Sequence, residues 1–558
     1  MAAEQKLCVG CTIGPIFSTM DKARNPVEIW MSSYMFSHFA ELLVDYFRND
    51  SRVRMITPTA EGCKIAASCK GVGLYSDHIF FEIIEDDEDA AKELIHRAKE
   101  FSIDEIAMEM ANSINGNRHD CKEIIDYLRQ ELFVLSAIQS VPYDHPIPVS
   151  QLTEQLDLLE CYPPFVARSD GERLDYLEKY LISLRKEKPD GWLHQHGIAK
   201  SAFAQLLNKK ADEADVSDEG EAAGKNISDR LEDYVVMVQA DGDNVGRFLG
   251  CLSNNGKIDD LMAFSDFLFN QGKHNAELVR SFGAIPIYFG GDDMLFISPV
   301  QGTLNGKKAF VFELIQQLET DFETACDELF TQRLSAVADA SPTDSFREYI
   351  SQFDEDSAVG KPALSFGVFM CHHRYPLKLI RKTAADALFG TAKRTEWTAH
   401  RSKKAVYTIM QKHSGQKSSI CFEASCGETQ STFAHFLLLL KSDITTFSLH
   451  ALHWKIHEQS AVVSYLLTMP DKEARAGRLK MWMKNNFDES PISDDDIEII
   501  MHFLCAIADD LWDGTNKPLD FAEAQKQIMR SVDGAFRMHE MFVRDKDDNE
   551  KPKEGMEE

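Results

Sequence analysis

Four consecutive residues, Gly290, Gly291, Asp292 and Asp293, lie between two short apolar runs within residues 284–298. Short apolar runs around paired glycines predict a β-hairpin, because the turns that fit the twist of the strands need positive φ angles. A hairpin by itself does not need two adjacent carboxylates at its tip. An acidic turn at the surface is one interpretation, since aspartate is common in turns, and a metal site is the other.

A second acidic cluster, Asp241 and Asp243, ends a β-branched run that begins at Tyr234. A helical segment over residues 258–281, closed by Gly283, separates the two clusters. This order of strand, helix, strand, turn and strand can place both clusters at one edge of a sheet. Converging carboxylates repel each other unless cations lie between them, and their oxygen atoms suit Mg²⁺ or Mn²⁺. Two such ions about 4 Å apart can activate a hydroxyl group and stabilise a leaving pyrophosphate, so the two clusters together favour the metal site.

The composition is that of a globular protein with several domains. The 558 residues are 44% hydrophobic and 27% charged, which is enough for about three or four domains. The net charge of −30 argues against a surface that binds nucleic acid generally, because such binding needs phosphate neutralisation. Local basic patches at residues 374–382 and 394–404 could bind RNA, or could be solvated faces. The scattered cysteines and the lack of a long apolar stretch favour a cytoplasmic protein.

The N-terminal region predicts the same order of elements as the acidic region. Strands are expected at residues 6–13, 53–58 and 78–84, with helices from Pro26 and at 89–100. This repetition indicates an internal duplication. The first copy has no acidic pair after its first strand and only Ser76 and Asp77 at its hairpin. We therefore expect that it holds no pair of metal ions and instead forms the other wall of a single active site.

The ordered set of motifs resembles the palm of nucleotide cyclases and polymerases, and more closely the large subunit of type III CRISPR effector complexes of the Cmr (III-B) group. The matching motifs, as they stand here, are Ile13-Gly14-Pro15, Ala23-Arg24, Ile29–Tyr34, Asp241-Gly242-Asp243-Asn244, Gly290-Gly291-Asp292-Asp293, Gly367-Val368, His372–Leu377, Ala385–Leu388 and Ala392-Lys393. They fall in two blocks, at about 10–50 and 234–394. The resemblance implies an α+β fold with two ferredoxin-like palm domains, the first of them degenerate, and additional helical domains.

With this resemblance the chain divides into six parts. We expect a first palm domain, a helical linker domain, a flexible linker poor in large apolar residues, a catalytic palm domain, a helical bundle and a disordered tail. Their expected bounds are residues 1–117, 118–208, 209–230, 231–411, 412–545 and 546–558. Within the second palm domain a long helix is expected at 307–334 and the fourth strand at 362–371.

The resemblance also implies the chemistry of the site. Asp241, Asp292 and the carbonyl group of Gly242 would bind the metal ions, and Asp293 would either join them or hold the attacking hydroxyl group. Asp243 would contribute if the strand stays extended through Gly242. A 3′-hydroxyl group would then attack the α-phosphate of ATP and release pyrophosphate. Four further residues are expected to bind the nucleotide, namely Asn244, Gly290, Gly291 and Lys393. The two glycines lack a Cβ atom and so allow the backbone to approach the nucleotide closely, and Lys393 would place a positive charge on the triphosphate.

The expected product is a nucleotide second messenger, made when the RNA-guided complex binds target RNA. It would be a cyclic oligoadenylate or a conjugate of AMP with S-adenosylmethionine, because both acceptors present a 3′-hydroxyl group. Partner subunits, CRISPR RNA and target RNA would complete the complex. The HD nuclease domain of many relatives precedes the first palm, and here Gly14-Pro15 leaves no room for it, so we expect no DNA cleavage and take His119-Asp120 as incidental. Two alternatives stay open, a free-standing diguanylate-type cyclase and a catalytically silent scaffold subunit.

Zinc is not expected from the cysteine pattern. Relatives often have four cysteines between the palms, whereas this region offers Cys121 and Cys161. Cys8 and Cys11 lie within one predicted strand and lack a partner pair. The pair His194 and His196 has no obvious further ligands.

Overall fold

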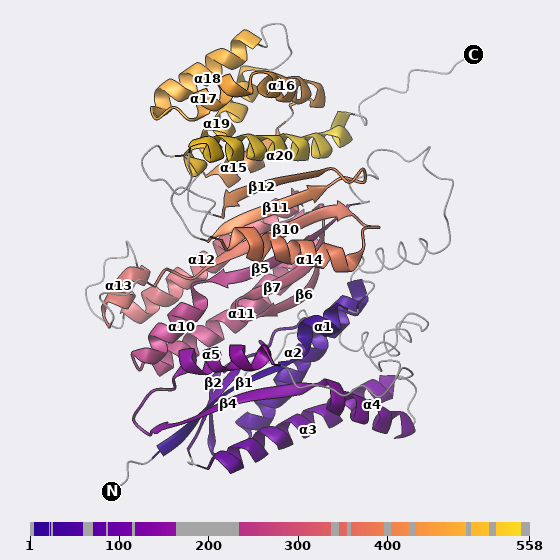
Figure 1. Ribbon diagram of the computed structural model, residues 1–558, viewed down its shortest axis with the longest axis vertical. Coiled ribbons are helices and arrows are strands. Elements are labelled where there is room, and N and C mark those ends of the chain that lie inside the picture. Colours follow the sequence, from indigo (N-terminus) through magenta and orange to yellow (C-terminus); the bar gives the residue numbers. More distant parts are fainter. Residues whose placement is uncertain are drawn as a thin grey trace. The chain divides into compact units, whose positions relative to one another are not determined.

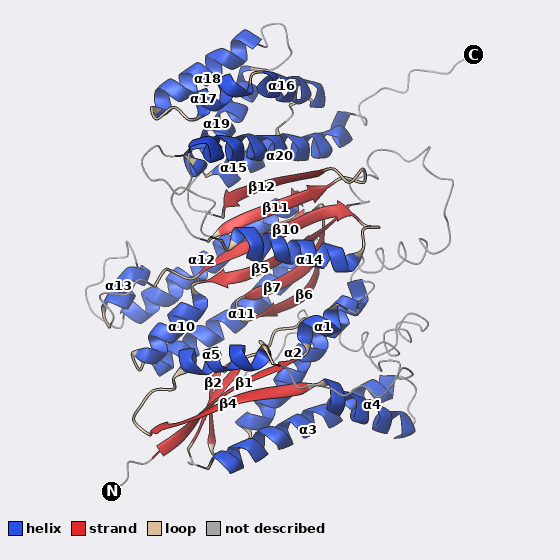
Figure 2. Cartoon of the chain, viewed as in Figure 1, coloured by secondary structure: helices blue, strands red, loops and turns tan. Residues whose placement is uncertain are grey.

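The computed structural model describes the chain at residues 5–21, 23, 26–59, 71–84, 87–113, 118–162, 234–335, 345–353, 359–394, 403–424, 431–442, 444–486, 493–512 and 521–547. These residues form the helices and strands of Figures 1 and 2. The chain divides into two compact units. Unit 1 comprises residues 1–213, 244–296 and 324–362, and unit 2 comprises 214–243, 297–323 and 363–558. Within the described ranges, no helix has the length and apolar character needed to cross a membrane.

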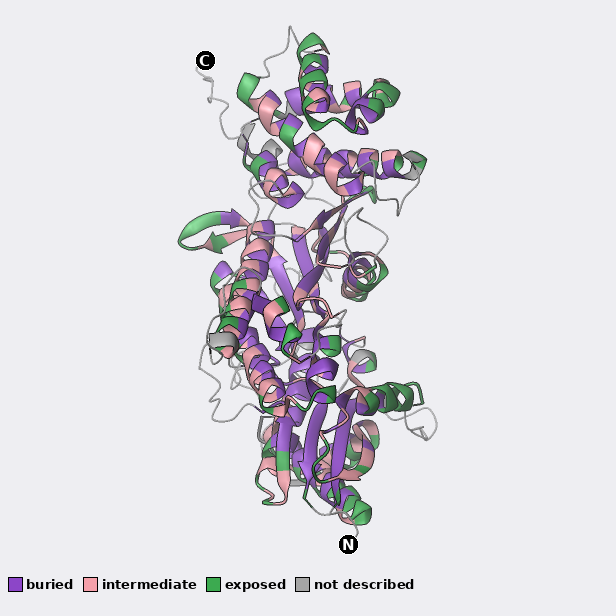
Figure 3. Ribbon diagram, turned by 90° about the vertical axis from the view of Figure 1, so that its left-hand side faces the viewer, coloured by how far each residue is buried: buried purple, intermediate pink, exposed green. Residues whose placement is uncertain are grey.

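The first palm domain is built on a four-stranded antiparallel sheet in unit 1, in the order β2-β3-β1-β4. Its strands are β1 (Gln5–Gly14), β2 (Val53–Thr57), β3 (Ile79–Ile83) and β4 (Phe133–Pro142). The helices of this region are α1 (Ile16–Met20), α2 (Pro26–Arg48), α3 (Glu88–Ser113), α4 (Arg118–Glu131) and α5 (Val149–Glu160). Strands β1 and β3 are almost entirely buried, which explains their apolar sequences (Figure 3).

The expected boundary of this domain at residue 117 is wrong, because β4 belongs to its sheet. Strand β4 pairs with β1 along its whole length, and Ile138 lies opposite Val9. The sequence predicted mainly helix from residue 118 onward. The residues of β4 mix apolar and polar side chains without a clear alternation, so their pattern does not distinguish a strand from a helix. The strand that pairs with β4 is more than a hundred residues away. His119 and Asp120 lie in α4, while the expected linker at 209–230 and the pair His194 and His196 lie outside the described residues.

The second palm domain has a six-stranded sheet in the order β12-β11-β10-β5-β7-β6. Its strands are β5 (Tyr234–Asp243), β6 (Ile285–Gly290), β7 (Asp293–Pro299), β10 (Ala363–His372), β11 (Ala405–Gln411) and β12 (Lys417–Glu423). Strand β10 runs antiparallel to β5 and parallel to β11. Two helices, α10 (Val245–Asn254) and α11 (Ile258–Phe282), connect β5 to β6, and Gly283 ends α11 with a φ of 98°. The predicted order of strand, helix, strand, turn and strand is confirmed.

Two further expectations about this domain need correction. The predicted helix at 307–334 begins only at α12 (Val311–Ser335), because β8 (Gln301–Leu304) and β9 (Lys307–Phe310) form a hairpin before it. Asn305 and Gly306 form its turn with φ angles of 50° and 74°, and Asn-Gly is a strong hairpin signal that the sequence analysis overlooked. The sheet also extends beyond residue 411, because β12 pairs with β11.

The C-terminal region is helical, as predicted. Its helices are α15 (Thr432–Lys441), α16 (Thr446–Glu458), α17 (Ser460–Leu467), α18 (Lys472–Asn486), α19 (Asp494–Leu511) and α20 (Phe521–Asp547). Helix α19 begins with a capping box between Ser493 and Asp496. Helix α20 packs closely on β12, because a Cβ atom at Gly534 would lie 2.2 Å from the carbonyl oxygen of Ser419. The tail beyond Asp547 lies outside the described residues.

Two short elements complete the second palm region. They are helix α13 (Ser345–Ser351) and α14 (Leu377–Ala387), which a π-helical turn (Leu388–Ala392) extends. Gly367 of β10 allows this helix to approach the sheet, because a Cβ atom there would lie 2.4 Å from the carbonyl oxygen of Ala384 and the backbone nitrogen of Leu388. The π-helical turn places Lys393 directly after it.

Candidate active site

The first acidic cluster lies at the end of β5 in unit 2. Asp241 is opposite Ser365 and Asp243 is opposite Ala363 in the pairing of β5 with β10. The strand therefore stays extended through Gly242, which was the condition for Asp243 to share a face with Asp241. The valines at positions 235, 236 and 238 favour the extended conformation in which β5 begins.

Asp243 is held from the neighbouring strand and loop. Its Oδ2 accepts hydrogen bonds from Ser365 Oγ at 2.5 Å and from the backbone nitrogen of Lys404 at 2.6 Å. Ser365 Oγ in turn accepts a hydrogen bond from the backbone nitrogen of Ala405 at 3.2 Å. Burial raises the pKa of Asp243, and the hydrogen bonds from Ser365 and Lys404 oppose that rise. The carboxylate is therefore fixed in place on one oxygen, which leaves the other for a ligand.

Lys393 lies among the oxygen atoms of this cluster. Its Nζ donates a hydrogen bond to the carbonyl oxygen of Gly242 at 2.9 Å, forms an ion pair with Asp241, and lies 3.9 Å from Asp243 Oδ1. Burial, and then repulsion from Lys403, lower the pKa of Lys393 to about 8. Sequence reasoning selected Lys393 for the triphosphate, and the structure places its ammonium group on the predicted metal ligands.

These oxygen atoms fit a divalent cation. Asp241 Oδ1 and Asp243 Oδ1 are both buried. Asp241 Oδ1 is the atom that pairs with Lys393 Nζ, and Asp243 Oδ1 accepts no hydrogen bond from the described residues. With the carbonyl group of Gly242 they form a set of hard oxygen ligands, which suits Mg²⁺ or Mn²⁺ rather than a softer metal. The ammonium group of Lys393 lies among these oxygen atoms.

The second acidic cluster lies on the hairpin between β6 and β7 in unit 1. Gly291 has a φ of 65°, and the two-residue turn of Gly291 and Asp292 has glycine in its first position, as in a type II′ turn. Gly290 belongs to β6 and has no such angle. A Cβ atom at Gly290 would lie 2.5 Å from the hydroxyl oxygen of Tyr288. Gly290 is therefore required by the packing of Tyr288, whereas the sequence analysis explained it by the approach of a nucleotide.

The first palm domain contributes a third acid to this hairpin. Within unit 1, Gly73 donates a backbone hydrogen bond to Ile287 and accepts one from Phe289, at 3.2 and 2.7 Å. Burial, followed by Asp292 and Asp77, raises the pKa of Asp293 well above its ordinary value. Residues of the first palm domain therefore lie against the acidic hairpin.

Asp77 is a member of this group that sequence reasoning did not select. It was noted only as part of the hairpin of the degenerate palm. Its Oδ1 lies 3.2 Å from His78 Nδ1, and it also contributes to the raised pKa of Tyr288, after burial. The signal that could have identified Asp77 is its equivalent position to Asp292 and Asp293 in the duplicated order of elements.

A comparison with protein families bears directly on these two clusters. Residues 234–401 match the family model for Cas10/Cmr2, second palm domain. This segment is therefore similar in sequence to the second palm domain of Cas10/Cmr2 proteins. It includes both acidic clusters and Lys393, and the match confirms the resemblance that the motifs indicated.

Solved structures with the same fold extend the comparison over the whole Cas10-like chain. The type III-B Cmr-beta structure in the apo state is 10% identical, covers 95% of this chain and 82% of its own, and has a TM-score of 0.52. The structure of type III-B Cmr-beta bound to cognate target RNA is 11% identical, covers 96% and 83%, and has the same TM-score. At this identity the likeness concerns the fold alone, and it confirms the predicted α+β architecture. No curated protein matches the chain in sequence.

Asn244 follows the first acidic cluster and is the N-cap residue of α10, in the left-handed conformation with a φ of 64°. Its Nδ2 donates a hydrogen bond to the carbonyl oxygen of Lys361 at 3.2 Å. Gly360 allows this contact, because a Cβ atom there would lie 2.5 Å from Asn244 Nδ2. Asn244 therefore connects the start of α10 to the segment before β10, a structural role in addition to the predicted role in nucleotide binding.

An open pocket of about 420 Å³ lies in unit 1 beside α5 and α10. It is lined by Ser150, Arg247, Gly250, Cys251, Asn254, Asn255 and Val359. None of these is a predicted catalytic or metal-binding residue, so the acidic clusters and not this pocket define the candidate active site.

Proposed function

We propose that this Cas10-like chain is the nucleotidyltransferase subunit of a type III CRISPR antiviral effector complex and makes a nucleotide second messenger from ATP. The observation that carries the proposal is the convergence of Asp241, the carbonyl group of Gly242 and Asp243 on one cation, the ammonium group of Lys393, within a Cas10/Cmr2 palm domain. In the reaction, a ribose 3′-oxygen forms a bond to the α-phosphorus of ATP. The bond from that phosphorus to pyrophosphate breaks, and the hydroxyl proton passes to a base.

In this proposal Asp241, Gly242, Asp292 and Asp293 would hold two Mg²⁺ or Mn²⁺ ions, and Asp243 would support the first cluster. When bound, such ions lower the pKa of the attacking hydroxyl group and neutralise the departing pyrophosphate. The arrangement of the chain supports the pairing of the clusters, because one ends β5 and the other begins β7 after the connecting helices.

The remaining steps belong to side chains of this chain. Asp293 either joins the metal ligands or holds the attacking hydroxyl group. With cations in its place at Asp241, Lys393 would be available to pair its ammonium group with the triphosphate. Its pKa of about 8 keeps it mainly protonated near neutral pH, which this role requires.

The acceptor is either another ATP-derived adenosine, which gives a cyclic oligoadenylate, or S-adenosylmethionine. Both present a 3′-hydroxyl group, so the same residues serve either reaction. The type III-B Cmr-beta structure bound to target RNA supports RNA and neighbouring subunits as partners. With a net charge of −30, this chain meets RNA through those partners or through local patches such as residues 374–382.

The test is turnover by the purified effector complex with target RNA. Labelled ATP is supplied with and without S-adenosylmethionine, with GTP in parallel, and products are identified by mass. Asp241→Asn should reduce the rate by about a thousandfold or more, because a lost metal ligand costs several kcal/mol of the barrier. Asp144→Asn, at an exposed position, is the matched control and should leave the rate unchanged. Cyclic di-GMP as the product would instead support a diguanylate-type cyclase.

A catalytically silent scaffold is the second candidate, because the ion pair of Lys393 with Asp241 is compatible with either role. In a scaffold, Lys393 neutralises the acids permanently and takes the place of a divalent cation. Mn²⁺ binding, followed by electron paramagnetic resonance in the presence of ATP, separates the two. An enzyme binds Mn²⁺ with Lys393 intact, whereas a scaffold binds it only after Lys393→Met and shows no turnover under any condition.

A further inference from the structure

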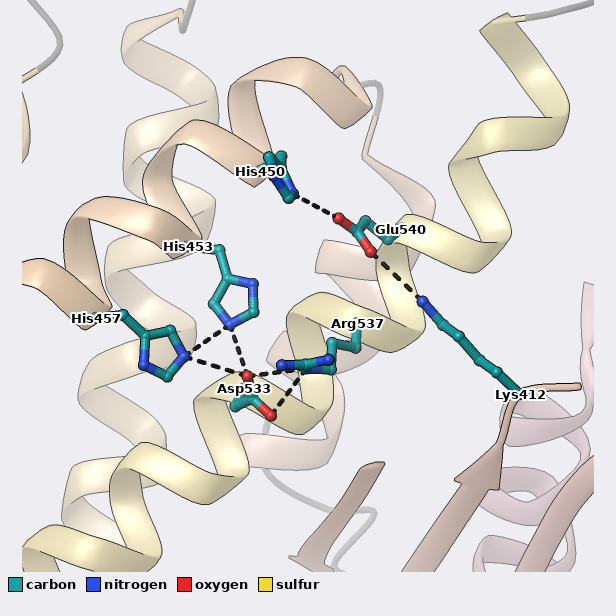
Figure 4. A network of polar contacts seen from close by, with 7 residues as sticks. All are labelled: Lys412, His450, His453, His457, Asp533, Arg537 and Glu540. Atoms are coloured by element: carbon teal, nitrogen blue, oxygen red, sulfur yellow. Dashed lines mark hydrogen bonds and ion pairs between the residues drawn. The ribbon is translucent and has the colours of Figure 1, made fainter. Parts of the chain in front are cut away.

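Two histidines and an aspartate meet in the C-terminal helical bundle of unit 2. His453 and His457 are four residues apart on α16 and therefore share one face of that helix. Asp533 faces them from α20 (Figure 4). His453 Nε2 lies 2.7 Å and His457 Nε2 lies 3.3 Å from the same oxygen, Asp533 Oδ1, and the two nitrogen atoms are 3.1 Å apart.

This spacing is poorly explained by hydrogen bonds alone. If both Nε2 atoms carry protons, their N–H groups crowd each other at one carboxylate oxygen. If either Nε2 atom lacks a proton, its lone pair points at the carboxylate oxygen, and the two acceptors repel each other. A tetrahedral metal ion with bonds of about 2.0–2.1 Å separates its ligand atoms by about 3.3 Å, which is close to the spacing of these three atoms.

Asp533 is prepared as an ionised and oriented ligand. Arg537 Nε donates hydrogen bonds to Asp533 Oδ1 and Oδ2, both at 2.9 Å. Despite partial burial, the hydrogen bonds from His453, Arg537 and His457 hold the pKa of Asp533 well below its ordinary value. If Asp533 Oδ1 binds a metal ion, Arg537 can still donate a hydrogen bond to Asp533 Oδ2. Metal ligands are commonly oriented by such hydrogen bonds from residues that do not touch the metal. The positive charge of Arg537 lowers the expected affinity below that of a site built from cysteines.

The exposure of the two histidines leaves room for a further ligand. The side chain of His457 is 53% exposed and that of His453 is 12% exposed, so one side of the group opens to water. One turn earlier on α16, His450 pairs with Glu540 at 3.0 Å, and Glu540 also pairs with Lys412 at 3.6 Å (Figure 4). That neighbouring network has a single histidine, paired with one carboxylate that also pairs with Lys412, so among the described residues it does not form a group of three metal ligands, which makes His450 a matched control.

We propose that His453 Nε2, His457 Nε2 and Asp533 Oδ1 bind one Zn²⁺ ion, with water as the fourth ligand, and that the ion links α16 to α20. Two imidazoles and one carboxylate favour a transition metal over Mg²⁺ or Ca²⁺, which prefer oxygen ligands throughout. The site is separate from the palm residues and does not depend on the proposed nucleotidyl transfer. The sequence analysis expected no zinc because it considered cysteines and the pair at 194 and 196, whereas Asp533 lies 80 residues from His453.

The experiment measures zinc bound to the full chain after chelation and equilibrium dialysis against Zn²⁺. Unmodified protein and His450→Gln should each retain one more zinc ion per chain than the double variant His453→Gln/His457→Gln. Substitution with Co²⁺ should give visible d–d bands without a thiolate charge-transfer band. Zn²⁺ should also raise the melting temperature of the unmodified chain and of H450Q, but not of the double variant.

The single variant His457→Gln keeps the test decisive if the double variant does not fold, because His457 is largely exposed. It should weaken zinc binding at least about tenfold, judged from the effect of second-shell changes alone at other metal sites. Equal zinc content in the unmodified chain and in these variants would overturn the proposal. So would an equal loss in H450Q, or a thiolate band that assigns the metal to cysteines.

Discussion

Replacement of Ser365 by alanine tests how the end of β5 holds Asp243 as a carboxylate. Ser365 is fully buried and Asp243 is 1% exposed, so neither side chain can exchange its partner for water. The hydrogen bond from Ser365 Oγ at 2.5 Å ends on an ionised acceptor, and such a bond contributes about 1.5–3 kcal/mol. At neutral pH, Ser365→Ala should lower the free energy of unfolding by this amount, which is roughly a 10- to 100-fold change in the folding equilibrium.

The loss should depend on pH. Burial raises the pKa of Asp243 in the folded state above its ordinary value of 3.8. At pH values between the unfolded-state pKa and the folded-state pKa, the folded state therefore binds more protons than the unfolded state. The free energy of unfolding therefore falls as pH rises through that interval. Removal of the Ser365 donor raises the pKa of Asp243 further, because the donor favours the ionised form. The difference between variant and parent should be smallest in acid, where Asp243 is protonated in both, and should grow as pH rises.

Urea unfolding of the full chain at a series of pH values measures both effects. Thr408→Val is the matched control, because Thr408 is fully buried on β11 and its hydroxyl group has no hydrogen-bond partner among the described residues. Replacing that hydroxyl with a methyl group should be neutral or stabilising. If Ser365→Ala were as stable as Thr408→Val, or if its loss were the same in acid and at neutral pH, the reasoning about Asp243 would be wrong.

Two more predictions concern buried charge and turn geometry. Burial raises the pKa of Glu319 from 4.5 to about 8, against the effect of Lys404, so the parent should lose about 1.4 kcal/mol of stability per pH unit as pH rises through that range. Glu319→Gln should remove this slope in urea unfolding, and an unchanged slope would contradict it. Gly291→Ala should lower the free energy of unfolding by about 1–2 kcal/mol, because Gly291 has a φ of 65°. Gly246→Ala in α10 is the control and should be neutral or stabilising, because a Cβ atom there meets open space. Equal melting temperatures of the two variants would contradict this prediction.

Local patterns identified most of the second palm domain. The β-branched run before Asp241 predicts a strand, the pattern of residues 258–281 predicts α11 with its glycine end, and the glycines before Asp292 predict the hairpin. Each of these depends on residues within one element or one turn, where the period of apolar residues and the preferred φ angles act directly. The duplicated order of the first palm follows for the same reason.

Strands β4 and β12 were missed. β4 has ten residues and pairs with β1, more than a hundred residues earlier, whereas β12 has seven residues and pairs with β11, which directly precedes it in the chain. Their pairing is a property of the folded sheet. The turn at Asn305 and Gly306 did have a local signal. The predicted helix at 307–334 began too early, because it included residues of β9 that precede α12.

The sequence by itself determined which residues are able to do chemistry, because an aspartate at the end of a strand is visible in the order of residues. The tertiary structure alone decided which of them meet. Lys393 lies 151 residues from Gly242, and Asp533 lies 80 residues from His453, yet each pair is in contact. Such contacts arise when sheets and helices pack to bury their apolar faces, and no periodicity along the chain records which polar groups that packing brings together.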